Sequence, residues 1–269
     1  MLKTRVITAI VLLAVLLPVT LFAPVAAFGV LIHVVVAFAA WEWARLLKAG
    51  KVGSIVYALI AALAVLASER LASPRPLFQA AGIFWIVAGP YVLVRKPVLA
   101  AGAWRAFLLA AGLVLFCACW HALVLARTSG VAFVLSLLLV VWLADIGAYF
   151  AGKAFGKHKL APAISPGKTW EGAVGGWAAV MIVAAVALAL HAFEPTLYSA
   201  LAGQLGLGRA FFVLTVLVAF SVVGDLFESM LKRQAGVKDS SGLLPGHGGV
   251  LDRIDALLPV LPLAMLLLG

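Results

Sequence analysis

Acidic and basic residues concentrate in one stretch near the C-terminal end of an otherwise apolar chain. Residues 221–255 read SVVGDLFESMLKRQAGVKDSSGLLPGHGGVLDRID and hold five of the ten acidic residues. Ionisable side chains at the edge of an apolar segment are costly to bury, so such a cluster predicts a functional site. Its acidic members are Asp225, Glu228, Asp239, Asp252 and Asp255, and its basic members are Lys232, Arg233, Lys238 and Arg253.

The acidic residues could hold a metal ion. Asp252 and Asp255 are three residues apart and would share one face of a helix. Asp225 precedes them, and Asp145 lies on an earlier apolar segment. Carboxylates that meet in one pocket repel each other unless a cation lies among them. Oxygen ligands without a histidine or cysteine cluster favour Mg²⁺ or a similar divalent ion, with a second metal ion as an alternative. The competing interpretation is a set of unrelated helix caps and ion pairs.

Two glycine-rich loops could bind phosphate groups. Residues 164–172 read ISPGKTWEG and supply a flexible turn, a cation and hydroxyls just before a helix, which suits an anion. The phosphate-binding G-x-x-x-x-G-K-[ST] pattern fails there, because proline occupies its first glycine position. Anchoring to lipid head groups is an equally good explanation. Residues 242–249 read GLLPGHGG, and glycine lets the backbone approach a ligand closely. The candidate side chains in these loops are Ser165, Lys168, Thr169 and His247.

The elements that must position these residues are apolar helices. The 269-residue chain is 65% hydrophobic with a mean hydropathy of +1.18, so we expect an all-α, polytopic integral membrane protein. About nine transmembrane helices can be drawn, at residues 6–23, 25–46, 52–68, 77–94, 106–126, 131–151, 171–191, 209–231 and 250–268.

The distribution of positive charge predicts how these helices are oriented. With a cytoplasmic N-terminus, 16 of the 20 lysine and arginine residues fall on the cytoplasmic side. The last helix must begin near Val250 to be long enough to cross, which places Asp252 and Asp255 at membrane depth, facing protein or water. Pro18 and Pro24 could instead make the first hairpin re-entrant.

The composition also excludes several alternatives. The net charge of +10 is loop charge that sets topology and faces anionic lipid or phosphate, so we expect no nucleic acid partner. Cys117 and Cys119 lie in an apolar run and are expected to be buried rather than bonded or metal-bound. We expect one membrane-embedded unit, with N-terminal helices over residues 1–130 and the site on helices over residues 131–269.

The C-terminal motifs resemble the signature of the phosphatidate cytidylyltransferases (CDP-diacylglycerol synthases). The signature residues run from Ser229 to Asp255 and include Lys232, Arg233, Lys238-Asp239, Pro245-Gly-His247-Gly-Gly and Asp252-Arg-Ile-Asp255. The Ala144-Asp145 segment and the loop from Ser165 to Gly172 also resemble that family. Residues 1–130 carry little specific signal.

The resemblance implies a nucleotidyltransferase of phospholipid biosynthesis. It would convert CTP and phosphatidic acid to CDP-diacylglycerol and pyrophosphate with a divalent metal. Both substrates are polyanions, so neutralising their charge would dominate the barrier. We expect Asp225 and Asp252 to bind the metal. Asp145 and Asp255 are expected to be catalytic beside the metal, and His247 to be catalytic at a phosphate. The expected substrate-binding residues are Ser165, Lys168, Thr169, Ser229, Lys232, Arg233, Lys238 and Asp239.

The expected location is a bacterial plasma (inner) membrane, with the site facing the cytoplasm. The expected partners are CTP, phosphatidic acid and membrane lipid, with a homodimer as one option. Two other functions stay open. One is a related membrane enzyme that uses CTP on another lipid, and the other is an ion-coupled transporter whose buried carboxylates bind the cation.

Overall fold

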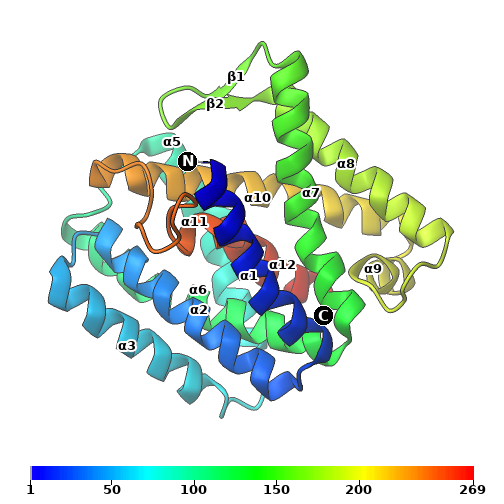
Figure 1. Cartoon of the computed structure of the whole chain (residues 1–269), viewed down its shortest axis with the longest axis horizontal. Coiled ribbons are helices and arrows are strands. Elements are labelled where there is room, and N and C mark those ends of the chain that lie inside the picture. Colours follow the sequence, from blue (N-terminus) through cyan, green and yellow to red (C-terminus); the bar gives the residue numbers. More distant parts are fainter. Residues whose placement is uncertain (1) are drawn as a thin grey trace.

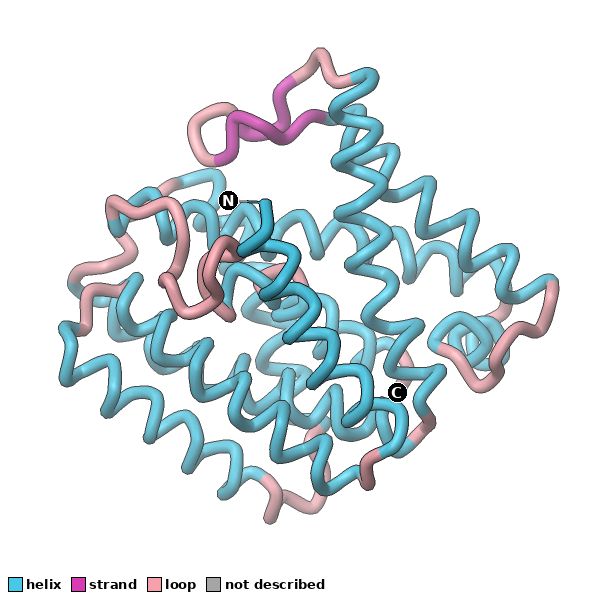
Figure 2. The backbone as a smooth tube through the Cα atoms, viewed as in Figure 1, coloured by secondary structure: helices cyan, strands magenta, loops and turns pink. Residues whose placement is uncertain are grey.

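Helices dominate a computed structural model that describes residues 2–269 (Figures 1 and 2). They are α1 (Leu2–Phe22), α2 (Val25–Leu46), α3 (Gly50–Ser68), α4 (Arg75–Ile83), η1 (Phe84–Ala88), α5 (Gly89–Arg95), α6 (Gly102–Thr128), α7 (Val131–Phe155), α8 (Trp170–Ala189), α9 (Leu197–Leu205), α10 (Leu207–Ala235), α11 (Leu251–Ile254) and α12 (Leu257–Leu267). One antiparallel hairpin pairs β1 (Lys159–Ala161) with β2 (Ser165–Thr169), at the top of Figure 1.

The helical class predicted from composition is confirmed. Within the described chain, seven helices are long and apolar enough to cross a membrane: α2, α3, the continuous run α4–η1–α5, α6, α7, α8 and α10. The first predicted span, residues 6–23, coincides with most of α1. Nine crossings and a cytoplasmic N-terminus therefore stay predictions. Neither the hairpin nor α9 was predicted.

The last segment is interrupted rather than continuous. The sequence predicts one helix over 250–268, but α11 ends at Ile254 and α12 begins at Leu257. Pro259 lacks the N–H that would bond to the Asp255 carbonyl four residues earlier, so the helical ladder cannot continue there. Pro262 likewise leaves the Leu258 carbonyl without its helical donor, and the Cys119 thiol donates to that oxygen at 3.6 Å. Cys117 and Cys119 are both buried, as the sequence predicts.

Helices α7 and α8 pack with their backbones almost touching, because glycines line the seam. A Cβ atom added at Gly172 would lie 2.9 Å from the Ala148 carbonyl oxygen, and one at Gly176 would collide with the Ala144 carbonyl. Lipid is as apolar as the helices, so the hydrophobic effect does not hold them together. Small residues at such a seam let helices approach closely enough for dispersion forces to do so. The seam fixes Asp145, on α7, relative to the hairpin that leads into α8.

An aromatic cluster joins the N-terminal helices to α10. Trp43 of α2 stacks on Phe227 of α10, with ring centroids 5.9 Å apart and an interplanar angle of 12°. Trp85 meets the other side of Phe227 edge-on at 5.4 Å. All three side chains are buried, and aromatic pairs of this kind contribute about 0.5–1.5 kcal/mol beyond their burial. The cluster holds α2 against the part of α10 that carries the acidic residues.

Candidate active site

One cavity collects side chains from α7, the hairpin, α8 and α10. Its volume is about 520 Å³. Asp145 and Tyr149 reach it from α7, where a separation of four residues places them on one face of the helix. Small residues of α7 and α8 form much of its wall, so the space exists because bulky side chains are absent there. Other residues that line it are Ser165, Lys168 and Thr169 of β2, and Ser221 and Asp225 of α10.

The hairpin brings a cation to α10. Lys168 Nζ lies 2.5 Å from Asp225 Oδ2, and both side chains are about a quarter exposed. The Ser229 hydroxyl donates to the other oxygen of Asp225 at 3.3 Å. Lys168 of the predicted anion-binding loop therefore contacts Asp225 of the predicted acidic cluster, although 57 residues separate the two in the sequence.

A carboxylate at the start of α8 fixes the base of the hairpin. Glu171 accepts hydrogen bonds from the backbone N–H groups of Lys157 at 3.1 Å and His158 at 3.2 Å. The His158 ring contacts the same carboxylate at 2.6 Å through Nδ1. The Thr169 hydroxyl accepts from the Gly172 N–H at 3.1 Å and so caps α8. These bonds set the direction in which the hairpin presents Lys168.

A second cation lies between two buried carboxylates near the end of α10. Lys232 Nζ is 2.5 Å from Glu228 Oε2 and 2.5 Å from Asp252 Oδ1. The side chains are 14%, 2% and 4% exposed, respectively, so all three groups have lost most of their hydration. The Glu228 contact lies outside hydrogen-bond geometry, and its Oε1 is also buried without a hydrogen-bond partner among residues 2–269. The triad carries one negative charge in excess when all three groups are ionised.

Asp252 is held so that its two oxygens face different surroundings. Oδ2 accepts from the Gly249 N–H at 2.7 Å, and from the Ser240 N–H and hydroxyl at 2.8 Å each. Oδ1 faces Lys232 alone. The three donors on Oδ2 fix the carboxylate, and Oδ1 is the oxygen left to face a cation.

Asp255 connects the two groups. A Cβ atom added at Gly224 would lie 2.5 Å from the Asp255 backbone oxygen, so α10 and the start of the last segment touch beside Asp225. The Asp255 side chain accepts from the Ala256 N–H at 2.8 Å. The acids on α10 and those on the last segment thus come together, as the sequence predicts.

Other predicted residues lie around this centre or apart from it. Arg233 donates through Nε to the Ile164 carbonyl at 3.3 Å, at the turn of the hairpin. Lys238 and Asp239 are exposed on the loop before α11 and join neither ion-pair group. His247 is partly buried in the glycine turn, where its backbone N–H donates to the Leu244 carbonyl at 2.8 Å.

The donor chemistry fits a hard divalent cation. Across residues 2–269, no three acidic, histidine or cysteine side chains form a ready-made metal cluster. Asp225 and Asp252 each direct one carboxylate oxygen at an ammonium group instead. Mg²⁺ is commonly held by only one or two carboxylates and completed by substrate phosphates and water. Each of the two aspartates could supply one such carboxylate.

One buried carboxylate that the sequence did not lead us to expect contacts the loop beside Asp252. Glu42 of α2 is fully buried. Its carboxylate accepts from the hydroxyls of Ser240 at 3.0 Å and Ser241 at 2.5 Å, and from the N–H groups of Val250 at 3.1 Å and Leu251 at 2.6 Å. A lone glutamate in the apolar segment AAWEWARL is itself the signal that could have identified it, since an intramembrane carboxylate needs partners.

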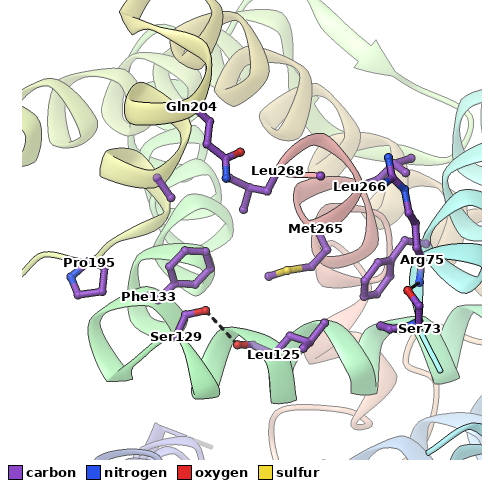
Figure 3. A pocket seen from close by; sticks show the side chains of 14 residues that line it. Ser73, Arg75, Leu125, Ser129, Phe133, Pro195, Gln204, Met265, Leu266 and Leu268 are labelled. Atoms are coloured by element: carbon purple, nitrogen blue, oxygen red, sulfur yellow. Dashed lines mark hydrogen bonds between the residues drawn. The ribbon is translucent and has the colours of Figure 1, made fainter. Parts of the chain in front are cut away.

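A second cavity lies at the opposite end of α7 from the hairpin. It has a volume of about 560 Å³ and contains none of the predicted site residues (Figure 3). Phe133 and Met265 line it, together with Arg75 and Gln204 near its edge. Its wall is mainly apolar, and we assign the chemistry to the cavity that holds Asp145 and Asp225.

The apolar helices, with paired acidic and basic side chains at one end, define a polytopic membrane protein equipped to handle phosphate groups. Residues 3–269 match the cytidylyltransferase family. The chain is similar to the phosphatidate cytidylyltransferase of Pseudomonas aeruginosa, with 44% identity over 276 residues that cover 100% of this chain and 97% of that protein.

Two shorter similarities point the same way. The Haemophilus influenzae phosphatidate cytidylyltransferase is 51% identical over 134 residues, covering 49% of this chain and 44% of that protein. The Staphylococcus saprophyticus one is 46% identical over 143 residues, covering 53% and 51%. The chain belongs to the cytidylyltransferase family, among the phosphatidate cytidylyltransferases. It is a nucleotidyltransferase.

Proposed function

We propose that the chain transfers the cytidylyl group of CTP to phosphatidic acid at the inner face of a bacterial plasma membrane. A phosphate oxygen of phosphatidic acid forms a bond to the α-phosphorus of CTP, the α–β bridging bond breaks, and pyrophosphate leaves. CDP-diacylglycerol is the other product. The observation that carries the proposal is the meeting of Lys168 and Lys232 with Asp225 and Asp252 at one end of the helices.

The side chains present suit two polyanionic substrates. Lys168 and Lys232 are cations that would exchange their carboxylate partners for phosphate oxygens, and Arg233 stands beside the hairpin. The attacking phosphate is already ionised at neutral pH, so the reaction needs charge neutralisation and alignment more than a strong base. Asp225 and Asp252 would hold a divalent ion, which supplies further neutralisation of the phosphates when bound.

The two ion-pair groups suggest where each substrate lies. The cavity beside Asp145 is bordered by apolar faces of α7 and α8, on which Tyr149 is 62% and Val174 59% exposed. We assign the phosphatidate head group to this cavity, with its acyl chains along that face. We assign the CTP phosphates to Lys232 and Arg233, next to the soluble loop. Asp255, between the groups, lies where the reacting phosphates would meet.

The test is pyrophosphate release by the purified full chain in lipid nanodiscs with CTP and Mg²⁺. Release that requires phosphatidic acid, and is absent with diacylglycerol, supports the proposal. Asp225→Asn should lower the rate at least about 100-fold, whereas Glu194→Gln, which removes a carboxylate far from the site, should not. Release without lipid, release only with another phosphorylated lipid, or vesicle uptake of a cation without CTP turnover would overturn it.

A further inference from the structure

The loop before α11 is tied to a helix near the other end of the chain. Its residues 240–251 connect the C-terminal part of α10 to Asp252, and they contact Glu42 of α2. We propose that Glu42 is a positioning residue of the active site: its carboxylate fixes this loop so that Asp252 presents Oδ1 to the reaction. The inference rests on the proposed function, because it assigns Asp252 a part in the reaction.

The hydrogen-bond partners of Glu42 hold its side chain in one position. Each oxygen lies within hydrogen-bond distance of one serine hydroxyl and one backbone N–H, all from the loop and the start of α11. Three of these donors face Glu42 alone, and the Ser240 hydroxyl is shared with Asp252. A residue that served only to fill space in α2 would not require four polar partners from one distant segment.

Glu42 and Asp252 are coupled through one hydroxyl. Ser240 Oγ lies 3.0 Å from Glu42 Oε2 and 2.8 Å from Asp252 Oδ2. A hydroxyl has one proton, so it can donate fully to one carboxylate at a time. The N–H of Leu251, directly before Asp252, donates to Glu42 at 2.6 Å. Glu42 therefore helps to fix Asp252 through two contacts, one with the Ser240 hydroxyl and one with the Leu251 N–H.

The space around this contact leaves little room for adjustment. Gly249 lies against both partners, and an added Cβ atom would collide with the Ser240 hydroxyl and the Glu42 carboxylate. Trp43, next along α2, is fixed by its stack on Phe227 and by donation from Nε1 to the Leu108 carbonyl at 3.0 Å. Glu42 thus projects from an anchored helix into a closely fitted loop.

Glutamine is the informative substitution because it keeps the shape of the side chain. Glu42→Gln replaces one acceptor oxygen by an NH₂ group that faces one backbone N–H and one serine hydroxyl. The hydrogen bond from the backbone N–H is lost, whereas the hydroxyl can rotate and accept from the NH₂ group. A displacement of Asp252 by about 1 Å would lower kcat by about 100-fold. The KM for CTP should stay within about threefold, because Glu42 does not touch substrate. Glu42→Asp keeps the charge and should recover part of kcat.

A spectroscopic readout separates positioning from general stability. Leu243, 41% exposed on the loop, is replaced by cysteine and spin-labelled; Cys117 and Cys119 are 5% and 4% exposed and so protected from the reagent. In the holoprotein we expect an immobilised spectrum, and a mobile one in Glu42→Gln. Glu194→Gln, with the same loss of charge elsewhere, should change neither spectrum nor kcat. If Glu42→Gln does not fold, Ser241→Ala removes a single donor and gives the same test.

The outcomes distinguish this inference from the proposed function. If the wild-type chain does not turn over CTP with phosphatidic acid, the proposed function fails. If the wild type is active and folded Glu42→Gln retains kcat within threefold with an immobilised loop, Glu42 is structural and the inference fails. A loss of folded protein with unchanged kcat per folded molecule also overturns it. Lost kcat with a mobile loop supports it.

Discussion

Replacing Lys232 by methionine would remove the one ammonium group that contacts both Glu228 and Asp252. Methionine keeps most of the apolar stem, so the change isolates the charge. The two carboxylates are 2% and 4% exposed, and each lies 2.5 Å from the nitrogen. Removing one partner of a buried ion pair costs about 3–5 kcal/mol, because the remaining charge is left unpaired in the interior.

Two carboxylates depend on this one cation, so we expect a loss at the upper end of that range, about 5 kcal/mol. Adding Glu228→Gln to Lys232→Met removes one of the unpaired charges and should restore stability by more than about 1 kcal/mol. The measurement is thermal unfolding in detergent, followed by intrinsic fluorescence, for the wild type, both single variants and the double variant. Salt should change the differences little, because the groups are shielded from solvent.

Two results would refute the reasoning. The first is a Lys232→Met variant within about 1 kcal/mol of the wild type, which would mean that the carboxylates are solvated or protonated without the ammonium. The second is a double variant that is no more stable than Lys232→Met, which would mean that Glu228 is not the group left unpaired. Either result would remove Lys232 from the electrostatic centre of the site.

Two further predictions concern the elements that carry the site. Gly176→Leu should separate α7 from α8 and lower the free energy of unfolding by about 1–3 kcal/mol, the range for overpacked interiors. Thermal unfolding measures this, and an unchanged midpoint would contradict the close packing of the two helices. Glu171→Gln should loosen the base of the hairpin, so trypsin should cut faster after Lys157 and Lys159 in limited digestion. A cleavage rate equal to that of Glu194→Gln would show that Glu171 does not restrain the hairpin.

The sequence predicted the elements that depend on composition. Apolar runs of about 20 residues can be recognised without tertiary information, because a membrane-crossing helix satisfies its own backbone hydrogen bonds. The gathering of Asp225, Asp252 and Asp255 was also predictable, since isolated carboxylates in apolar segments need partners. The interruption at Asp255 could have been found from Pro259, which has no N–H to bond to the Asp255 carbonyl.

Features that depend on contacts between distant segments were not predictable in the same way. The hairpin at 159–169 is short and polar, and no hydrophobic alternation marks its strands. Lys168 could have faced lipid head groups, and its contact with Asp225 required the closeness of α7 and α8. The four partners of Glu42 lie 198–209 residues further along the chain, so no local pattern identifies them.

That long separation has a consequence for biosynthesis. During translation Glu42 is synthesised about 200 residues before any of its four donors. The carboxylate must therefore spend that interval protonated, hydrated or in contact with the insertion machinery, because an unpartnered charge is costly in lipid. The contacts of Glu42 can form only when almost the whole polypeptide has been made. Folding of the loop before α11 is therefore a late event in the maturation of the enzyme.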